Sequence, residues 1–324
     1  MPTPEAPQPA AAAGASAAAG HDRFAGVMSL LLTPFDHNLA IDWTSYDRYV
    51  DWQLEQQPQG LFAVCGTSEM KWLTREERLE LARRAVQRAG EVPVLATANL
   101  DPDRSAHPAE LRALEDAGVA GVVLVPPDGL GADPPALEAY FAALADAAGV
   151  PVFLYEWPQV RSYFLSAESF GRLVREHGVK GIKDTTCTAA GITAKIEAAP
   201  QAIVYQANTP YLPEALAAGA RGIMAITSAA CADLVIAYWN AATRDVRGED
   251  ARFYHAQLVF LDAVLRQGHP LLSKRLLQRR GIDFPLACRW PQDVAPEACR
   301  ALEAWHEQAR PILARLGAKE EKAS

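Results

Sequence analysis

Eight short apolar runs alternate with longer amphipathic segments along most of the chain, and this alternation restricts the possible folds more than any other feature. Uninterrupted runs rich in Val, Ile and Leu are typical of parallel strands that are buried on both faces. The runs occupy residues 26–35, 60–66, 92–98, 120–127, 151–156, 179–184, 202–208 and 221–227. The sequence therefore predicts eight buried strands separated by helices.

The segments between the runs carry helix start and stop signals. Thr74 precedes an amphipathic stretch with Glu77 three residues further on, which is the pattern of a capping box, and Gly90 ends that stretch. Ser166 and Gly178 bracket a second predicted helix in the same way. Gly-Val pairs then lead into several of the apolar runs, so one kind of helix-to-strand connection repeats along the chain.

Strand-then-helix units in this number predict an α/β protein with a (β/α)8 TIM barrel. A doubly wound open sheet is the weaker alternative, because no G-x-G-x-x-G motif follows the first run. Beyond the last run, helical periodicity predicts an eighth barrel helix and a C-terminal helical appendage, at residues 229–243, 250–267, 270–280 and 294–315. The expected divisions are a disordered Ala/Pro-rich tail (1–21), the barrel (22–243), a C-terminal helical region (244–316) and a frayed tail (317–324).

Composition argues against several functional classes. The net charge is −8 and no basic run is interleaved with aromatic residues, so we expect no nucleic-acid partner. No apolar run approaches the ~20 residues that a membrane-spanning helix needs, and the first residues contain Glu5 but no Lys or Arg, unlike a secretory signal. The five cysteines are scattered and form no C-x-x-C pair, so we expect reduced thiols, a cytoplasmic location and no zinc site.

Two lysines flank a glycine and an isoleucine in the run at 179–184. In a TIM barrel the active site lies at the carboxyl ends of the strands, so Lys183 is expected to face the site and Lys180 the opposite end. Burial there disfavours the ammonium form and lowers the pKa of a lysine from about 10.4. A neutral amine can attack a ketone and form a Schiff base. The alternative is a lysine that pairs with a neighbouring carboxylate for charge balance.

Other predicted strand ends carry polar residues with suitable chemistry. Tyr155 ends the run at 151–156, and its phenol can shuttle a proton, although a rim tyrosine with its hydroxyl in water is also common. Gly66, Thr67 and Ser68 follow the second run, where their amides and hydroxyls can hold a carboxylate without a cation. The same three residues also suit an ordinary N-terminal turn.

Several motifs follow one another in a fixed order, at residues 26–35, 66–78, 154–158, 181–184 and 219–223. Together they resemble the dihydrodipicolinate synthase / N-acetylneuraminate lyase family of class I aldolases, and the helical appendage also fits that family. The resemblance implies a TIM barrel that forms a lysine Schiff base with pyruvate or another 2-oxo acid. It also implies a homo-oligomer, dimer or tetramer, and neither a metal nor an organic cofactor.

The resemblance gives each residue at these strand ends a role. Lys183 would form the Schiff base and Tyr155 would shuttle the proton. Thr67 and Ser68, with Gly66, would bind the carboxylate of the 2-oxo acid, and one of the two hydroxyls would position Tyr155. The protonated imine is an electron sink, which permits aldol cleavage, condensation or dehydration.

The remaining positions bear on which 2-oxo acid is used. Asn208 and Ile226 complete the expected substrate-binding set, and the neutral stretch 206–209 lacks the acidic residues that hold sugar hydroxyls in sialic acid lyases. Asp184 and the two threonines after it resemble members that act on sugar acids, although this carboxylate equally suits a structural role. Glu156 is expected either as a rim charge or as a contact to substrate.

The chain departs from the synthase branch in three places. The turn after the second run is one residue shorter before Leu73, the loop at 126–131 lacks the tyrosine that synthases lend across a dimer interface, and Val160, followed by Arg161, occupies an arginine position. These departures favour a lyase for pyruvate or a 2-oxo-3-deoxy sugar acid. A 4-hydroxy-tetrahydrodipicolinate synthase stays open as an alternative, and so does a non-catalytic keto-acid-binding barrel.

Two other enzyme classes fit the sequence less well. A pyridoxal-phosphate enzyme also uses a lysine imine, but the loops after the last two runs contain no clear glycine turn for its phosphate. A metal-dependent aldolase needs a set of ligands, and the seven histidines show no ligand spacing. Visible absorbance would reveal the first class, and loss of activity with a chelator would reveal the second.

Overall fold

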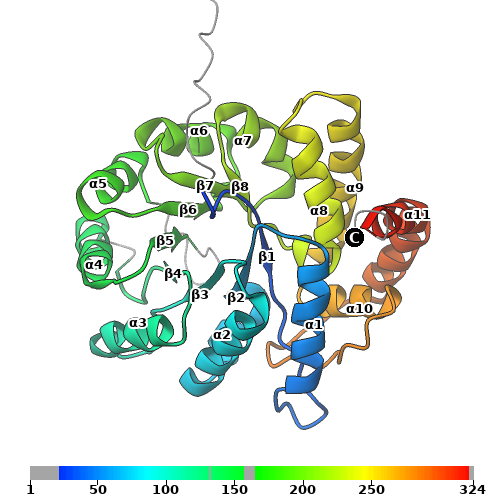
Figure 1. Ribbon diagram of the computed structural model, residues 1–324, viewed down its shortest axis with the longest axis horizontal. Coiled ribbons are helices and arrows are strands. Elements are labelled where there is room, and N and C mark those ends of the chain that lie inside the picture. Colours follow the sequence, from blue (N-terminus) through cyan, green and yellow to red (C-terminus); the bar gives the residue numbers. More distant parts are fainter. Residues whose placement is uncertain (1–21, 131–132, 157–164, 321–324) are drawn as a thin grey trace, which may run out of the picture.

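The computed structural model describes residues 22–130, 133–156 and 165–320. Within these residues, eight parallel strands close into a barrel in chain order, and the first strand pairs with the eighth (Figure 1). The strands are β1 (Gly26–Leu30), β2 (Gly60–Val64), β3 (Val94–Thr97), β4 (Gly121–Leu124), β5 (Val152–Tyr155), β6 (Gly181–Asp184), β7 (Ile203–Gln206) and β8 (Gly222–Ile223). Each lies inside one of the predicted apolar runs, so the predicted TIM barrel is confirmed.

Helices surround the barrel and follow its strands in turn (Figure 1). They are α1 (Trp43–Glu55), α2 (Arg75–Ala89), α3 (His107–Asp116), α4 (Pro134–Ala147), α5 (Ala167–His177), α6 (Ala189–Ala198), α7 (Leu212–Ala218) and α8 (Ser228–Ala242). The chain continues in α9 (Glu249–Leu265), α10 (Leu271–Arg279) and α11 (Pro296–Glu320), as the helical periodicity of this region predicts. No helix in the described part of the chain combines the length and apolar character of a membrane span.

The predicted start and stop signals of α2 and α5 act as expected. Thr74 Oγ1 accepts a hydrogen bond from the Glu77 backbone, and the Glu77 carboxylate accepts one from the Thr74 backbone, which closes the capping box. Ser166 caps the start of α5 through its hydroxyl. Gly178 ends α5 with a φ of 66°, in the left-handed region that favours glycine because it has no Cβ.

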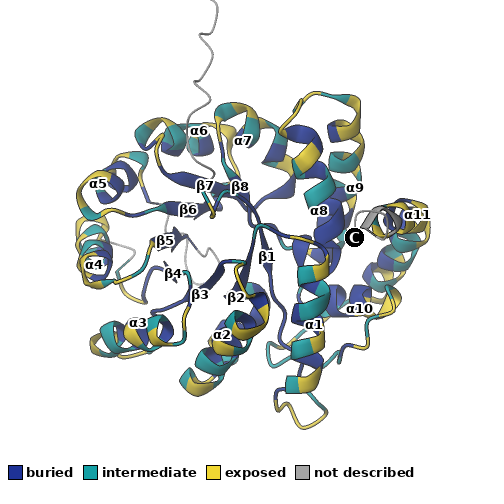
Figure 2. Ribbon diagram, in the orientation of Figure 1, coloured by how far each residue is buried: buried dark blue, intermediate teal, exposed yellow. Residues whose placement is uncertain are grey.

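The strands are buried on both faces, and the helices expose the sides that face away from the barrel (Figure 2). Aromatic rings pack against one another inside the barrel, where the ring centroid of Phe153 lies 5.1 Å from that of Phe24 and 5.9 Å from that of Tyr205. The Tyr205 hydroxyl donates to the Phe24 backbone oxygen at 2.6 Å. Gly222 leaves room for the Tyr205 ring, where a Cβ would collide. These contacts pack the three side chains of Phe24, Phe153 and Tyr205 against one another beside the start of β1.

The C-terminal helices pack directly on the barrel helices. The α9 helix packs against α8, and both α10 and α11 contact α8 and α9 (Figure 1). One hydrophobic cluster continues from the barrel into the appendage, where it includes Leu258, Leu272 and Trp305. The predicted N-terminal tail (1–21) lies outside the described residues. The first part of the predicted frayed C-terminal tail, residues 317–320, is instead the end of α11. The boundary expected between the barrel and the C-terminal region, at 243/244, stays a prediction.

Candidate active site

Lys183 and Tyr155 lie side by side at the carboxyl ends of neighbouring strands. They are directly paired in the register of β5 and β6. The Nζ atom of Lys183 lies 4.2 Å from the centroid of the Tyr155 ring and 5.7 Å from that of Phe62. Lys183 is 5% exposed and Tyr155 is 7% exposed. Lys180, at the opposite end of the strand, instead pairs with Asp22 at 2.8 Å.

Burial sets the charge of this pair. It lowers the pKa of Lys183 to about 8, because the ammonium loses hydration among aromatic and apolar side chains. Over the residues that the structure describes, Lys183 forms no salt bridge, so the charge-balance alternative finds no partner there. Burial also raises the pKa of the Tyr155 phenol, which keeps it protonated. The site thus holds an amine with a neutral fraction beside a phenol that carries its proton.

The turn after β2 uses its two hydroxyls differently. Gly66–Ser68 form a single 3-10 turn, η1. The Ser68 hydroxyl accepts from the Cys65 backbone N–H and donates to the Cys65 carbonyl, both at 2.8 Å, so it is engaged within the turn. The Thr67 hydroxyl instead lies 3.0 Å from Nε2 of His269, a residue that stands just before α10. The two hydroxyls therefore have different partners: that of Ser68 bonds within the turn, and that of Thr67 faces the C-terminal appendage.

Glu69 connects the same turn to the C-terminal appendage. It is fully buried and adopts a left-handed φ of 61°, which is uncommon for a residue other than glycine. Its carboxylate accepts from the Lys274 ammonium at 2.8 Å and from the Trp290 backbone N–H at 2.7 Å. Lys274 is itself fully buried and donates to the Ala287 carbonyl at 2.6 Å. The appendage therefore places a cation directly against the turn that precedes α2.

A second buried charge cluster lies between β5, β6 and α6. Because side chains alternate along a strand, Asp184 points away from Lys183 and toward the surrounding helices. Lys195 of α6 donates to Asp184 at 2.7 Å and to Glu156 at 2.6 Å, and no member of the cluster is more than 2% exposed. Burial raises the pKa of Glu156 to about 6, and the positive charge of Lys195 opposes that rise. The expectation of Glu156 as a rim charge is wrong, because this carboxylate is buried in an ion pair with Lys195. Asp184 pairs with the same lysine, which is a contact of the structural kind that the sequence allowed for it.

The two other predicted substrate contacts lie beyond β7 and β8. Asn208 is buried, and its Oδ1 accepts from Arg266 at 3.3 Å, while its Nδ2 has no partner among the described residues. Ile226 is partly buried and packs against the hydrophobic core. Val160 and Arg161, at the position where synthases carry an arginine, lie outside the described residues.

Comparison with known proteins shows where this arrangement belongs. A model of the dihydrodipicolinate synthetase family matches residues 23–307. The chain belongs to the dihydrodipicolinate synthetase family. The 4-hydroxy-tetrahydrodipicolinate synthase of Pseudomonas savastanoi pv. phaseolicola (strain 1448A / Race 6) is 29% identical over 298 residues, which cover 90% of this chain and 98% of that protein.

Solved structures with the fold of this family superpose closely on the chain. YagE, a prophage protein of E. coli K12 solved in complex with pyruvate, gives a TM-score of 0.82 at 22% identity, over 89% of this chain and 99% of that one. Dihydrodipicolinate synthase DapA-2 of Bacillus anthracis gives a TM-score of 0.81 at 25% identity, over 88% and 98%. Members of the dihydrodipicolinate synthetase family are class I aldolases and lyases, so the chain is a lysine Schiff-base lyase, as its motifs imply.

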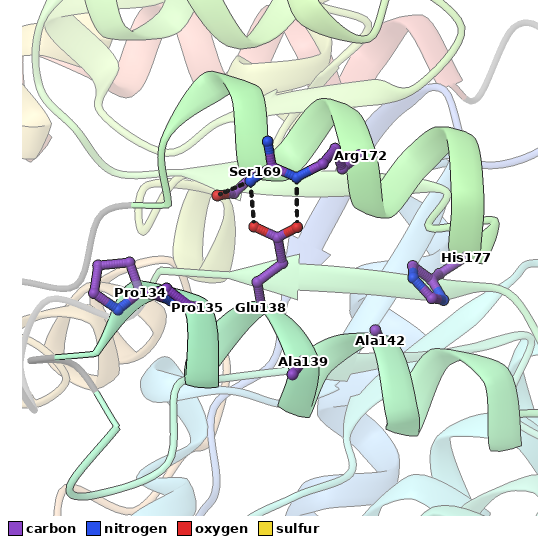
Figure 3. Close-up of a pocket in the computed structure, with 8 residues that line it drawn as sticks. All are labelled: Pro134, Pro135, Glu138, Ala139, Ala142, Ser169, Arg172 and His177. Carbon is purple, nitrogen blue, oxygen red and sulfur yellow. Dashed lines mark hydrogen bonds and ion pairs between the residues drawn. The ribbon is translucent and has the colours of Figure 1, made fainter.

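A groove on the outer surface of the barrel lies apart from the carboxyl ends of the strands. It has a volume of about 350 Å³ and lies between α4 and α5 (Figure 3). Across it, Arg172 makes two hydrogen bonds of 2.7 Å to the Glu138 carboxylate. None of the predicted site residues lines this groove, so the candidate active site is the cluster at the carboxyl ends of β2, β5 and β6.

The family motifs identify the functional residues at the strand ends, but they do not identify three buried residues that lie beside them. His269 and Lys274 come from the appendage, and Lys195 comes from α6. The sequence offers weak signals for two of them, because each lysine interrupts an apolar helical stretch, in LLSKRLL and in GITAKIEA. A lysine at an apolar position indicates burial, although not the partner that makes burial tolerable.

Proposed function

We propose that Lys183 forms the Schiff base through which this enzyme acts on pyruvate or another 2-oxo acid. The observation that carries the proposal is the position of its amine, buried at the carboxyl end of β6, with a lowered pKa and without a carboxylate partner among the described residues. Lys195 and Lys274 are also buried. Two carboxylates hold Lys195, and the carboxylate of Glu69 holds Lys274. Lys183 alone among these three has an amine that is free to react.

The reaction follows from an amine with a neutral fraction. The lone pair of Lys183 Nζ adds to the C2 carbonyl of the 2-oxo acid and gives a carbinolamine. A proton delivered to the carbinolamine hydroxyl lets it leave as water, and a protonated imine remains. Removal of a C3 proton sends its electron pair toward the iminium nitrogen and gives an enamine. The enamine carbon can then bond to an aldehyde, and the reverse step cleaves that bond. Tyr155, protonated and next to the amine, is suited to carry the protons that these steps move.

We assign the carboxylate of the 2-oxo acid to Thr67. The Ser68 hydroxyl already donates to and accepts from Cys65, so it has no proton left for a substrate. The Thr67 hydroxyl is instead directed at Nε2 of His269, lies beside the Cys65 thiol, and belongs to the turn η1. The position of Lys183 supports the same assignment. Its positive charge acts to lower the pKa of the Cys65 thiol and of the His269 imidazole, so the amine lies close to the side chains around Thr67.

We propose a 2-oxo-3-deoxy sugar acid, or pyruvate with the matching hydroxyaldehyde, as the substrate class. The hydroxyl of Thr185 and the Nδ2 of Asn208 are buried polar atoms that have no partner among the described residues, at the carboxyl ends of β6 and β7. Buried polar groups in proteins are almost always hydrogen-bonded, so a hydroxylated ligand or water is expected there. The synthase reaction is the second candidate, since curated relatives carry that name.

A substrate panel separates these two candidates. Pyruvate release from a series of 2-oxo-3-deoxy sugar acids, and pyruvate uptake with a series of aldehydes, should be measured on the same enzyme preparation. Formation of 4-hydroxy-tetrahydrodipicolinate at a rate above that of every hydroxyaldehyde reaction would establish the synthase. Reductive trapping with no pyruvate adduct on Lys183 would instead contradict the proposal and favour a non-catalytic barrel.

Replacing Tyr155 by phenylalanine should lower kcat by roughly 10²- to 10⁴-fold, the usual contribution of a general acid–base group. The variant keeps the ring that packs on Lys183, so a borohydride-trapped pyruvate adduct should still form, only more slowly. Tyr46→Phe is the matched control, because its buried hydroxyl donates to the Leu81 carbonyl between α1 and α2. An equal loss of kcat in the two variants would contradict a proton-carrying role for Tyr155.

The rate of imine formation should depend on pH through Lys183. Only the neutral amine attacks, so the initial trapping rate should rise about tenfold per pH unit below the amine pKa and level off above it. Since burial lowers the pKa of Lys183 to about 8, the plateau should begin near pH 8. Cyanoborohydride trapping of pyruvate across a pH series measures this profile. A rate that still rises at pH 10 would show an ordinary, solvated lysine.

We also propose that the enzyme assembles into a dimer or tetramer in the cytoplasm. Phe253 and Phe260 of α9 are 43% and 64% exposed, and their spacing of seven places them on one side of the helix. Exposed apolar side chains of this size suit contact with a second copy. All five cysteines are free, as expected in a reducing compartment. Sedimentation of the purified protein gives the number of copies.

A further inference from the structure

His269 joins the C-terminal appendage to the hydroxyl of Thr67. It lies just before α10, and its Nε2 is 3.0 Å from Thr67 Oγ1. Its Nδ1 is 2.8 Å from the hydroxyl oxygen of Ser273, in the first turn of α10. Ser273 is fully buried and Thr67 is 4% exposed. Each ring nitrogen therefore faces a hydroxyl, and one of these hydroxyls is the proposed contact to the substrate carboxylate.

The imidazole of His269 is held neutral by its surroundings. Burial lowers the pKa of His269 to about 3, and the positive charges of Lys183, Lys274 and Arg266 act in the same direction. A neutral imidazole has one N–H donor and one acceptor nitrogen. It therefore cannot donate to both hydroxyls at once, and the position of its single proton decides how each hydroxyl is oriented.

The direction of the bond between His269 and Thr67 matters because a carboxylate can only accept hydrogen bonds. If the proton is on Nε2, the imidazole donates to Thr67 Oγ1, and the Thr67 proton remains available for the substrate. Nδ1 then accepts from the Ser273 hydroxyl. If the proton is on Nδ1, the Thr67 hydroxyl donates to Nε2 and presents lone pairs, which repel an anion.

We propose that His269 is a positioning residue of the active site, which donates from Nε2 to Thr67 and so directs the Thr67 hydroxyl at the carboxylate of the 2-oxo acid. The inference rests on the proposed function, since it requires Thr67 to hold that carboxylate. It gives the C-terminal appendage a part in substrate selection. Ketones with an anionic group next to the carbonyl are favoured, and neutral ketones of the same size are not.

The test compares trapping of pyruvate with trapping of pyruvamide, its neutral analogue, on the full-length enzyme. His269→Leu should raise the half-saturating pyruvate concentration roughly 10- to 100-fold, as expected for loss of one charge-assisted hydrogen bond. The half-saturating pyruvamide concentration should change by less than about 3-fold, because a neutral amide loses a weaker bond. The trapping rate at saturation should stay within a few-fold of wild type, because Lys183 is unchanged.

Two further variants separate positioning from simple structural support. His269→Gln places an amide donor near the position of Nε2 and should recover most of the pyruvate affinity. Combining His269→Leu with Thr67→Val should weaken pyruvate no more than Thr67→Val alone, because both changes remove the same donor to the carboxylate. If His269→Leu does not fold by circular dichroism, Ser273→Ala replaces it, and it should also weaken pyruvate more than pyruvamide.

Equal losses for pyruvate and pyruvamide would overturn the inference, and so would additive losses in the double variant. Either result shows that His269 merely supports the local fold, and it leaves the proposed function intact as long as the wild-type enzyme traps pyruvate on Lys183. A wild-type enzyme that traps no pyruvate would overturn the proposed function, and the role of His269 with it.

Discussion

Replacing Lys183 by methionine should abolish turnover and leave the fold at least as stable as that of the wild type. Methionine keeps the apolar contacts with the rings of Tyr155 and Phe62 but has no amine to form an imine. The rate should fall by roughly 10³-fold or more, as it does when other covalent nucleophiles are removed. Pyruvate-release assays measure the loss, and mass spectrometry after borohydride treatment should show no adduct.

The stability of Lys183→Met follows from the sign of the pKa shift. Burial lowers the pKa of Lys183 to about 8, so the folded protein at pH 7 contains an ammonium that prefers to be solvated. The unfavourable contribution is complete below pH 8 and disappears as the pH rises toward the unfolded value of 10.5. Denaturant titrations at pH 7 should therefore give the variant an unfolding free energy equal to or above that of wild type.

Lys180→Met is the matched control for this experiment. The two lysines occupy opposite ends of one short strand, but the Lys180 side chain is 38% exposed and is paired with Asp22. A pair this exposed contributes at most about 1 kcal/mol, and its loss should leave turnover and the pyruvate adduct unchanged. Wild-type turnover in Lys183→Met, or an adduct that depends on Lys180, would contradict the assignment of the reactive amine.

Replacing Lys195 by methionine should destabilise the protein by about 3–5 kcal/mol, the usual cost of removing one partner from a buried ion pair. Its ammonium is bonded to Glu156 and Asp184, and both carboxylates are fully buried. Without Lys195 these two negative charges face each other out of contact with water. Urea titration of the folded protein measures the loss, because the midpoint moves in proportion to the free energy of unfolding.

The pH dependence of Lys195→Met identifies the cause of its instability. Burial already raises the pKa of Glu156 to about 6, and losing Lys195 raises it further. A carboxyl whose folded pKa is raised loses stability as the pH rises from its unfolded pKa toward its folded one. The destabilisation should therefore be smaller at pH 5 than at pH 8. A loss that does not depend on pH would show a packing defect instead of two uncompensated charges.

Two controls bracket the expected size of this effect. Adding Glu156→Gln and Asp184→Asn to Lys195→Met removes the stranded charges and should restore part of the stability. Arg172→Met breaks the Arg172–Glu138 pair at the outer groove, where the side chains are 35% and 20% exposed (Figure 3). Solvent screens that pair, so its loss should cost below about 1 kcal/mol.

The barrel could be predicted from the sequence because its determinants are local. A run such as VPVLATA has no polar face, so it must be covered on both sides, and a signal such as Thr74 with Glu77 marks a helix start within four residues. Successive strand and helix units then leave few possible topologies. The position of Lys183 at the barrel mouth follows from the same reasoning, because the end of its strand is visible in the run itself.

Contacts between distant residues could not be predicted in this way. Glu69 and Lys274 are 205 positions apart, and Lys195 is 39 positions from Glu156. The apolar residues around each of these charges in the sequence indicate that it is buried. They do not indicate which residue of opposite charge pairs with it. The different uses of Thr67 and Ser68 were also hidden, because they depend on how a short turn closes on Cys65. The part of His269 depends on where the appendage returns to the barrel.

The pairing of Glu69 with Lys274 sets an order of events during protein synthesis. At typical elongation rates of 5–20 residues per second, the ribosome delivers Lys274 roughly 10–40 s after Glu69. Throughout that interval the nascent chain carries the Glu69 carboxylate without its counter-ion, and the Thr67 hydroxyl lacks its contact with His269. A message cut short after the last strand would thus yield a chain that contains Lys183 but lacks both the counter-ion of Glu69 and the imidazole that faces Thr67.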